Sequence, residues 1–150
     1  MDRLPAARSS DPHVQRLVQR FEQLSPADLP RLHEIYTEDA QFKDPFNEVQ
    51  GVAAITAVFE HMYRTLEAPR FVVHTALLEG QQCFLAWDFV FRLRRGRHGE
   101  LTVRGGSHLL LASDRRISLH RDYWDVAEEL YEQLPVLGGL MRWLKRRARS

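Results

Sequence analysis

Cysteine is almost absent from this sequence: Cys83 is the only one in 150 residues. A single cysteine excludes a disulfide within the chain and fits a reducing compartment. Because Cys83 begins an apolar run, we expect a buried, unreactive thiol. The first ten residues carry charge and proline but no apolar stretch. We therefore expect no secretory signal there and a cytoplasmic protein.

Long apolar runs and a strong net charge are also missing. No segment approaches the roughly 20 apolar residues of a membrane span. The formal net charge is +1, so no overall field draws the chain to nucleic acid, and we expect no such partner. The composition, 44% hydrophobic and 27% charged, is typical of a globular domain. We expect a flexible tail over 1–11, one domain over 12–126 and a helical extension over 127–150.

Apolar residues recur at helical spacing in the first half of the chain. The first helical face carries Val14, Leu17, Val18, Phe21 and Leu24. Asp28 can cap a second helix, which carries Leu29, Leu32, Ile35 and Tyr36. A short strand over 41–45 and a loop ending at Gly51 come before a third helix, which carries Val52, Ile55, Val58, Phe59 and Met62. The sequence thus predicts three helices in this half.

The second half changes to strand patterns. The segments 70–79, 83–94, 101–112 and 116–124 are rich in Val, Leu, Phe and Trp and are separated by hairpin-length turns. Helices followed by strands predict an α+β domain, with the helices packed on one face of a curved antiparallel sheet. A final amphipathic helix over about 126–147, with a basic cluster near its end, is interrupted near Pro135.

Polar residues share a strand face with aromatic residues near the end of the predicted sheet. Alternation places His120 and Asp122 on the face that also carries Trp124. A tight turn near 113–115 places His108 opposite either His120 or Asp122, close enough for a hydrogen-bonded pair. The alternative is that these polar groups face water on the open side of the sheet.

Residues 36–46, with the sequence YTEDAQFKDPF, are followed by Gly51 and a helix. Together with the last strand, 116–124, this segment resembles ketosteroid isomerases and SnoaL-like polyketide cyclases of the nuclear-transport-factor-2-like superfamily. The resemblance covers about 13–126. It implies a cone-shaped domain with an apolar interior pocket, and a homodimer formed through the outer sheet face. It also implies that Asp44 is the general base.

The resemblance further implies a set of ligand-binding residues. These are Tyr36, Phe46, Phe59, Met62, Trp87, Phe89, Phe91, His120 and Trp124. The sequence also departs from the isomerase pattern. Phe21 and Phe59 replace two tyrosines, and His108 aligns with a protonated aspartate that donates a hydrogen bond. Losing an oxyanion donor costs roughly a hundredfold in rate, so ketosteroid isomerase activity itself is not expected.

The leading hypothesis is a cofactor-free enzyme that acts on a small apolar carbonyl compound. Asp44 is its predicted base, and His108 supported by Asp122 is predicted to polarise the substrate oxygen. The residues show no HxH or HExxH spacing, so we expect no metal. Three alternatives stay open. In the first, Asp44 serves only as a turn acceptor before Pro45. In the second, the protein binds its ligand without catalysis. In the third, it is an adaptor whose basic C-terminal helix contacts a partner or a membrane.

Overall fold

The computed structural model describes residues 5–94, 99–126, 128 and 129. Its helices are α1 (Pro12–Glu22), the 3-10 helix η1 (Pro26–Glu34) and α2 (Val52–Thr65). Its strands are β1 (Tyr36–Lys43), β2 (Glu48–Gln50), β3 (Leu66–Glu79), β4 (Gln82–Leu93), β5 (Leu101–Leu111) and β6 (Ile117–Tyr123). No helix within these described ranges is long and apolar enough to cross a membrane.

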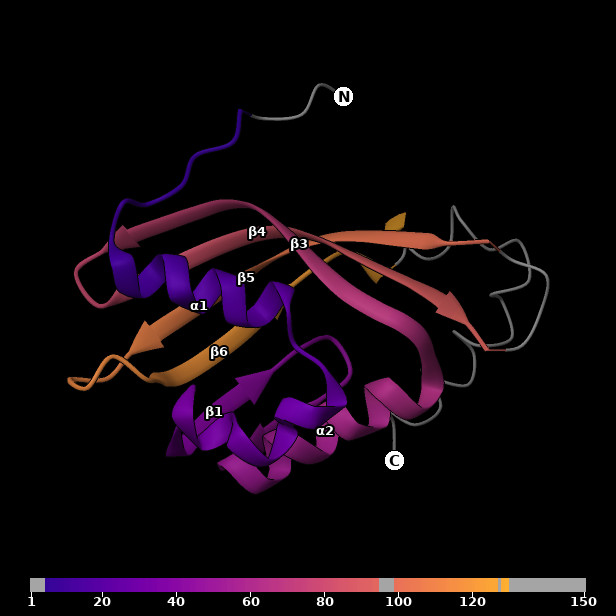
Figure 1. Cartoon of the computed structure of the whole chain (residues 1–150), viewed down its shortest axis with the longest axis horizontal. Coiled ribbons are helices and arrows are strands. Elements are labelled where there is room, and N and C mark those ends of the chain that lie inside the picture. The colour runs from indigo at the N-terminus through magenta and orange to yellow at the C-terminus, as the bar shows by residue number, and fades with distance from the viewer. Residues whose placement is uncertain (1–4, 95–98, 127, 130–150) are drawn as a thin grey trace.

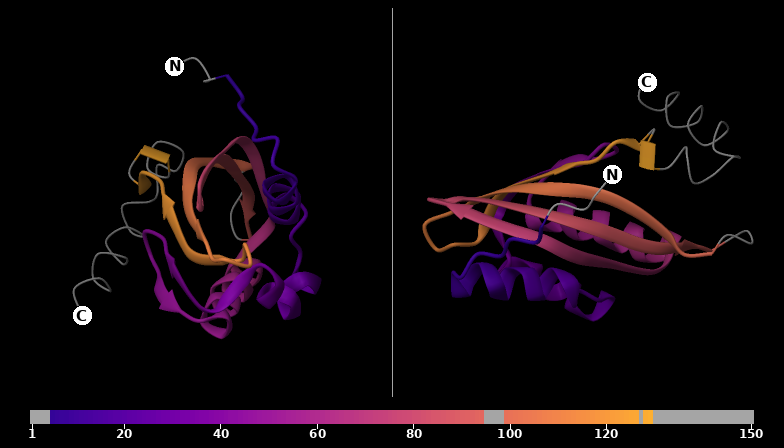
Figure 2. Two further views of the ribbon diagram at one scale, coloured as in Figure 1. Left: turned by 90° about the vertical axis from the view of Figure 1, so that its left-hand side faces the viewer. Right: turned by 90° about the horizontal axis from the view of Figure 1, so that it is seen from above.

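The six strands form one curved, open sheet in the order β2-β1-β6-β5-β4-β3. Strands β3 to β6 are the predicted antiparallel meander. One pair differs from the expectation of an antiparallel sheet, because β1 runs parallel to β6. The sheet bends around an interior that α1 and α2 cover (Figures 1 and 2). The predicted α+β class and the packing of helices on one face of the sheet are confirmed.

The first two helices begin at capping residues. The Asp11 carboxylate accepts from the backbone amides of His13 and Val14, which satisfies two free donors at the start of α1. The second helix begins after Ser25, one turn earlier than predicted. Asp28 lies inside its first turn and accepts from the backbone amide of Ser25 at 2.9 Å. This bond returns to the residue before the helix, as in a capping box.

The core lies between the helices and the inner face of the sheet. Helix α1 buries the apolar face predicted for it, and α2 buries Ile55 and Phe59. On β4, Trp87 and Phe91 are buried in the interior and Phe89 packs beside them. The interior side of this strand is therefore the predicted one, as expected from the alternation of side chains along a strand.

Residues 7–9, which fall within the flexible tail predicted for 1–11, are bonded to the edge of the sheet. Ala7 and Ser9 exchange backbone hydrogen bonds with Ala76 of β3, both of 2.8 Å. The Arg8 guanidinium donates to the Val73 carbonyl at 2.6 Å. These bonds cover part of an edge strand whose polar backbone groups would otherwise be unpaired.

The chain leaves β6 toward the outer face of the sheet. The Glu129 carboxylate accepts from the backbone amide and the guanidinium of Arg104, both at 3.1 Å. Most of the helix predicted over 126–147, with its basic cluster, lies outside the described residues. The predicted membrane or partner contact of that helix therefore stays a prediction.

Candidate functional site

His120 and Asp122 lie on the interior face of β6, as their alternation predicted. Nε2 of His120 is 2.6 Å from Oδ1 of Asp122. On its other side, Nδ1 of His120 is 2.7 Å from the hydroxyl of Tyr36, which begins β1. The parallel pairing of β1 with β6 brings these residues together across the interior. The His120 ring is enclosed by the rings of Phe21, Tyr36 and Phe42.

The surroundings of Tyr36 determine where the protons lie in the hydrogen bonds from Tyr36 through His120 to Asp122. Complete burial raises the pKa of Tyr36 well above its usual value, and the charge of Asp122 raises it further. The phenol therefore keeps its proton and can donate a hydrogen bond to Nδ1 of His120. A neutral imidazole that accepts at Nδ1 carries its proton on Nε2. His120 consequently donates from Nε2 to the Asp122 carboxylate.

Ser107 extends this series of hydrogen bonds, although neither its residue type nor its spacing indicated a site. Its hydroxyl donates to Oδ1 of Asp122 at 2.5 Å, and the indole N–H of Trp87 donates to its oxygen at 2.8 Å. Ser107 lies on β5 directly opposite Asp122. The result is an interior chain of bonds that runs from Tyr36 through His120, Asp122 and Ser107 to Trp87.

The predicted pairing of His108 with His120 or Asp122 is wrong. The register places Arg121 opposite His108, and His108 lies on the outer face, where Nε2 is 2.9 Å from Oε1 of Gln82. An irregularity between Leu110 and Leu111 shifts the register of β5 against β6 by one residue. A shift of one residue moves every side chain to the opposite face. His108 therefore cannot polarise a ligand that lies beside Asp122.

Asp44 follows β1 and sits in a turn. Its Oδ1 accepts from the backbone amides of Phe46 and Asn47, at 2.8 and 2.6 Å. The Asn47 side-chain amide lies 3.1 Å from each carboxylate oxygen. The turn-acceptor interpretation is thus observed. Burial nevertheless raises the pKa of Asp44 despite these hydrogen bonds, and the nearby charge of Asp122 acts in the same direction.

Aromatic rings line the interior around these polar groups. Phe71 stacks on Phe89 with 4.7 Å between ring centroids, and its edge meets Trp87 at 5.4 Å. At the rim, Phe46 is 46% exposed and packs edge-on against Trp124. Of the other residues in the predicted ligand-binding set, Phe59 is buried and Met62 is partly buried against the same core. The predicted set therefore shares one interior, with Phe46 at its edge.

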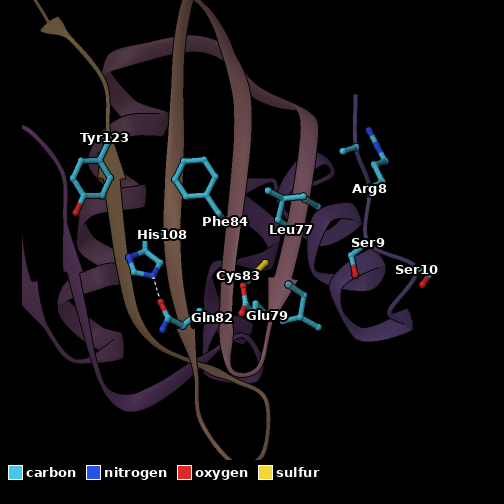
Figure 3. Close-up of a pocket in the computed structure, with 13 residues that line it drawn as sticks. Arg8, Ser9, Ser10, Leu77, Glu79, Gln82, Cys83, Phe84, His108 and Tyr123 are labelled. Carbon is cyan, nitrogen blue, oxygen red and sulfur yellow. Dashed lines mark hydrogen bonds between the residues drawn. The ribbon is translucent and has the colours of Figure 1, made fainter. Parts of the chain in front are cut away.

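A hollow of about 770 Å³ lies on the outer face of the sheet. Figure 3 shows Leu77, Phe84, His108 and Tyr123 around it, beside the N-terminal residues from Arg8 to Ser10. The bond between His108 and Gln82 lies at one end of this hollow. This is a different place from the interior pocket that the sequence predicted. Across the described ranges, no three His, Cys, Asp or Glu side chains are grouped to hold a metal ion.

The model of the SnoaL-like domain matches residues 14–120. The chain belongs to the SnoaL-like domain family. This match spans most of the chain and includes Tyr36, Asp44, Ser107 and His120. No curated protein matches the chain.

Solved structures share the fold of this SnoaL-like domain at low sequence identity. A hypothetical protein from Catenulispora acidiphila, with a ketosteroid isomerase-like fold and in complex with trimethylamine, is 12% identical with a TM-score of 0.70. The match covers 83% of this chain and 94% of that one. A putative SnoaL-like polyketide cyclase from Shewanella putrefaciens is 19% identical with a TM-score of 0.69, over 83% and 97% of the two chains.

A third solved structure with the same fold is an epoxide hydrolase. The LEH-like epoxide hydrolase from M. tuberculosis is 17% identical with a TM-score of 0.66, over 86% of this chain and 95% of that one. Proteins with this fold are thus described as cyclases and as hydrolases. Because one fold carries several kinds of chemistry, function has to be argued from the residues of this chain.

Proposed function

We propose that this SnoaL-like domain binds a small apolar carbonyl compound on the interior face of its sheet and moves a proton on it without a cofactor. The observation that carries the proposal is the nearness of two carboxylates, Asp44 and Asp122, beside an aromatic interior. Lys43 of β1 pairs with Arg121 of β6, so Asp44 and Asp122 each come one residue after a paired position on neighbouring strands. Burial is the main cause of the raised pKa of Asp44, and the charge of Asp122 is a smaller one. Reactions of this kind include isomerisation and cyclisation.

Asp44 is the base in this proposal. A general base works best when its pKa lies close to the working pH, and burial raises the pKa of Asp44 in that direction. The charge of Asp122 favours the protonated form that Asp44 takes after accepting a proton. The surrounding rings, such as Phe46 and Trp124, provide apolar contact for a ligand near the rim.

The donors around Asp122 narrow the class of ligand. The hydroxyl of Tyr36 is directed at His120 and that of Ser107 at Asp122, while Phe21 has no donor. None of these three groups is available to stabilise a developing oxyanion. A suitable substrate therefore stabilises its own enolate through conjugation. This favours 1,3-dicarbonyl or polyketide-like compounds over simple ketones.

Hydrogen–deuterium exchange tests the proposal directly. The protein is incubated in D2O with apolar ketones, enones and 1,3-dicarbonyl compounds, and loss of the α-proton signal is followed by NMR. We expect exchange with 1,3-dicarbonyl compounds to be faster than in a sample without protein, and we expect Asp44→Asn to return the rate to that background while binding persists. Asp39→Asn is the matched control, because Asp39 lies on β1, the strand that Asp44 follows, is exposed, and its carboxylate accepts from the Thr37 hydroxyl.

Two other outcomes are informative. If ligands raise the melting temperature but no α-proton exchanges, the protein binds without catalysis, which is the alternative function. If no compound either exchanges or shifts the melting temperature, the proposal of an apolar carbonyl ligand is wrong.

We also propose that the outer sheet face joins two copies of the chain. Leu77, Phe84 and Tyr123 are large side chains on this face, and each is 40% exposed or more. Exposed apolar groups gathered on one face are typical of interaction sites. Phe84→Glu should convert a dimer to a monomer in light scattering coupled to size-exclusion chromatography. A monomeric wild type at high concentration would disprove this assembly.

A further inference from the structure

Ser107 lies on β5, and its side chain links this strand to Asp122 of β6 at the candidate site. It is 4% exposed, and its oxygen takes part in two hydrogen bonds. Because the hydroxyl accepts from the Trp87 indole, its own proton is free to be donated to Oδ1 of Asp122. The direction of both bonds is therefore fixed, and both lead toward the carboxylate.

The Asp122 carboxylate is held from two directions through the same oxygen. Ser107 reaches Oδ1 from the neighbouring strand at 2.5 Å, and His120 reaches it along β6 at 2.6 Å. Hydrogen bonds to a charged acceptor are shorter and stronger than neutral ones. With both donors on Oδ1, the carboxylate has a defined rotation, and Oδ2 is left for other contacts.

Gly105 lets Trp87 take part in this arrangement. A Cβ at Gly105 would lie 2.6 Å from Cη2 and 2.9 Å from Cζ3 of Trp87. The indole therefore lies directly over the Gly105 backbone, and its N–H meets Ser107, two residues further along the same face. The position of the ring is set by the absence of a side chain at residue 105.

We propose that Ser107, itself held by Trp87, is a positioning residue that fixes the Asp122 carboxylate so that Oδ2 faces the ligand. This inference rests on the proposed function, which places the ligand beside Asp122. Ser107 touches no reacting atom in this scheme. It acts by restricting the rotation of the carboxylate, as residues that preorganise a site do.

The test uses the ligand-free protein, so it does not depend on a substrate. The measured signal is the NMR resonance of the His120 Nε2 proton, which lies in the 2.6 Å bond to Asp122 and should be far downfield. Ser107→Ala removes one of the two anchors of Asp122. We expect the resonance to move upfield or to be lost by exchange with water, although Ser107 does not bond to His120. Ser107→Thr keeps the hydroxyl and should restore the signal.

Ser118→Ala is the matched control. Ser118 lies on β6 and its hydroxyl bonds only to the Leu110 carbonyl, at 3.2 Å. We expect no change in the His120 signal in this variant, and a smaller upfield change in Trp87→Phe than in Ser107→Ala. An unchanged signal in Ser107→Ala, or an equal change in Ser118→Ala, would overturn the inference. If the coupling is seen but no ligand exchanges protons faster than without protein, Ser107 still positions the Asp122 carboxylate, while the role of Oδ2 toward a ligand fails with the proposed function.

Discussion

His120 and Asp122 stand two positions apart on β6, and their side chains meet at 2.6 Å. Residues at this spacing on a strand project to the same face, so the strand itself brings the imidazole and the carboxylate together. The two side chains are only 6% and 13% exposed. Burial makes this pair costly to leave unsatisfied, and its partners Tyr36 and Ser107 complete its hydrogen bonds.

Removing the Tyr36 hydroxyl should destabilise the protein. In Tyr36→Phe, Nδ1 of His120 loses its donor in a site without access to water, and leaving one buried group unsatisfied costs about 1–3 kcal/mol. The free energy of unfolding in urea measures this loss. Tyr63→Phe is the control, because Tyr63 lies on α2 and is only partly buried. Equal free energies for the two variants would contradict the role of the Tyr36 bond.

The stability of Asp44→Asn should depend on pH relative to wild type. Burial raises the pKa of Asp44 above its ordinary value of 3.8. The folded protein thus favours the protonated group, whose stabilising contribution is full below the unfolded pKa and is lost as pH rises through the folded pKa. Asparagine has no proton to lose. The variant should therefore gain stability relative to wild type as pH rises above the ordinary value of 3.8 and through the raised folded pKa.

Asp28→Asn should show the opposite trend and serves as the control. Hydrogen bonds from the Ser25 backbone and side chain, together with Arg31, lower the pKa of Asp28. Its contribution is present above the unfolded pKa and is lost as pH falls through the folded pKa. Urea unfolding at several pH values measures both trends. The same pH trend in both variants would show that burial does not determine the pKa of Asp44.

Adding a methyl group at Gly105 should be costly. The new Cβ would lie 2.6 Å from the Trp87 ring and 3.0 Å from Cβ of Trp124, which is closer than atoms pack. Overpacking of this kind costs about 1–3 kcal/mol. Gly105→Ala should also change the tryptophan fluorescence, because the ring must move. A Cβ at Gly99 meets nothing within 4 Å, so Gly99→Ala should leave both properties unchanged.

The Cys83 thiol should be nearly inert in the folded protein. It is 1% exposed, and burial raises its pKa to about 11. The thiolate is the reactive form, so a rise of about two pKa units lowers its amount roughly a hundredfold. A disulfide reagent should therefore modify Cys83 rapidly only in denaturant. Equal rates in native and unfolded protein would refute the predicted buried thiol.

The sequence alone determined the order of the three helices and of the four long strands that follow them, and the inward side of β4 and β6. Periods of about 3.6 and of 2 residues are local properties, so the apolar face of α1 and the shared face of His120, Asp122 and Trp124 could be predicted from neighbouring residues. The Asp44–Pro45 turn is local as well, because its acceptor bonds to the amides that follow it. The family resemblance added the curved, open fold.

Only the tertiary structure decided which residues meet across strands. A bulge between Leu110 and Leu111 sets the register, and so Ser107 instead of His108 faces Asp122. The parallel docking of β1 beside β6 places Tyr36 against His120, which are 84 residues apart in the chain. Neither contact can be predicted from the spacing of residues along one segment. Register depends on turn geometry and on packing, and one residue of slip exchanges the two faces of a strand.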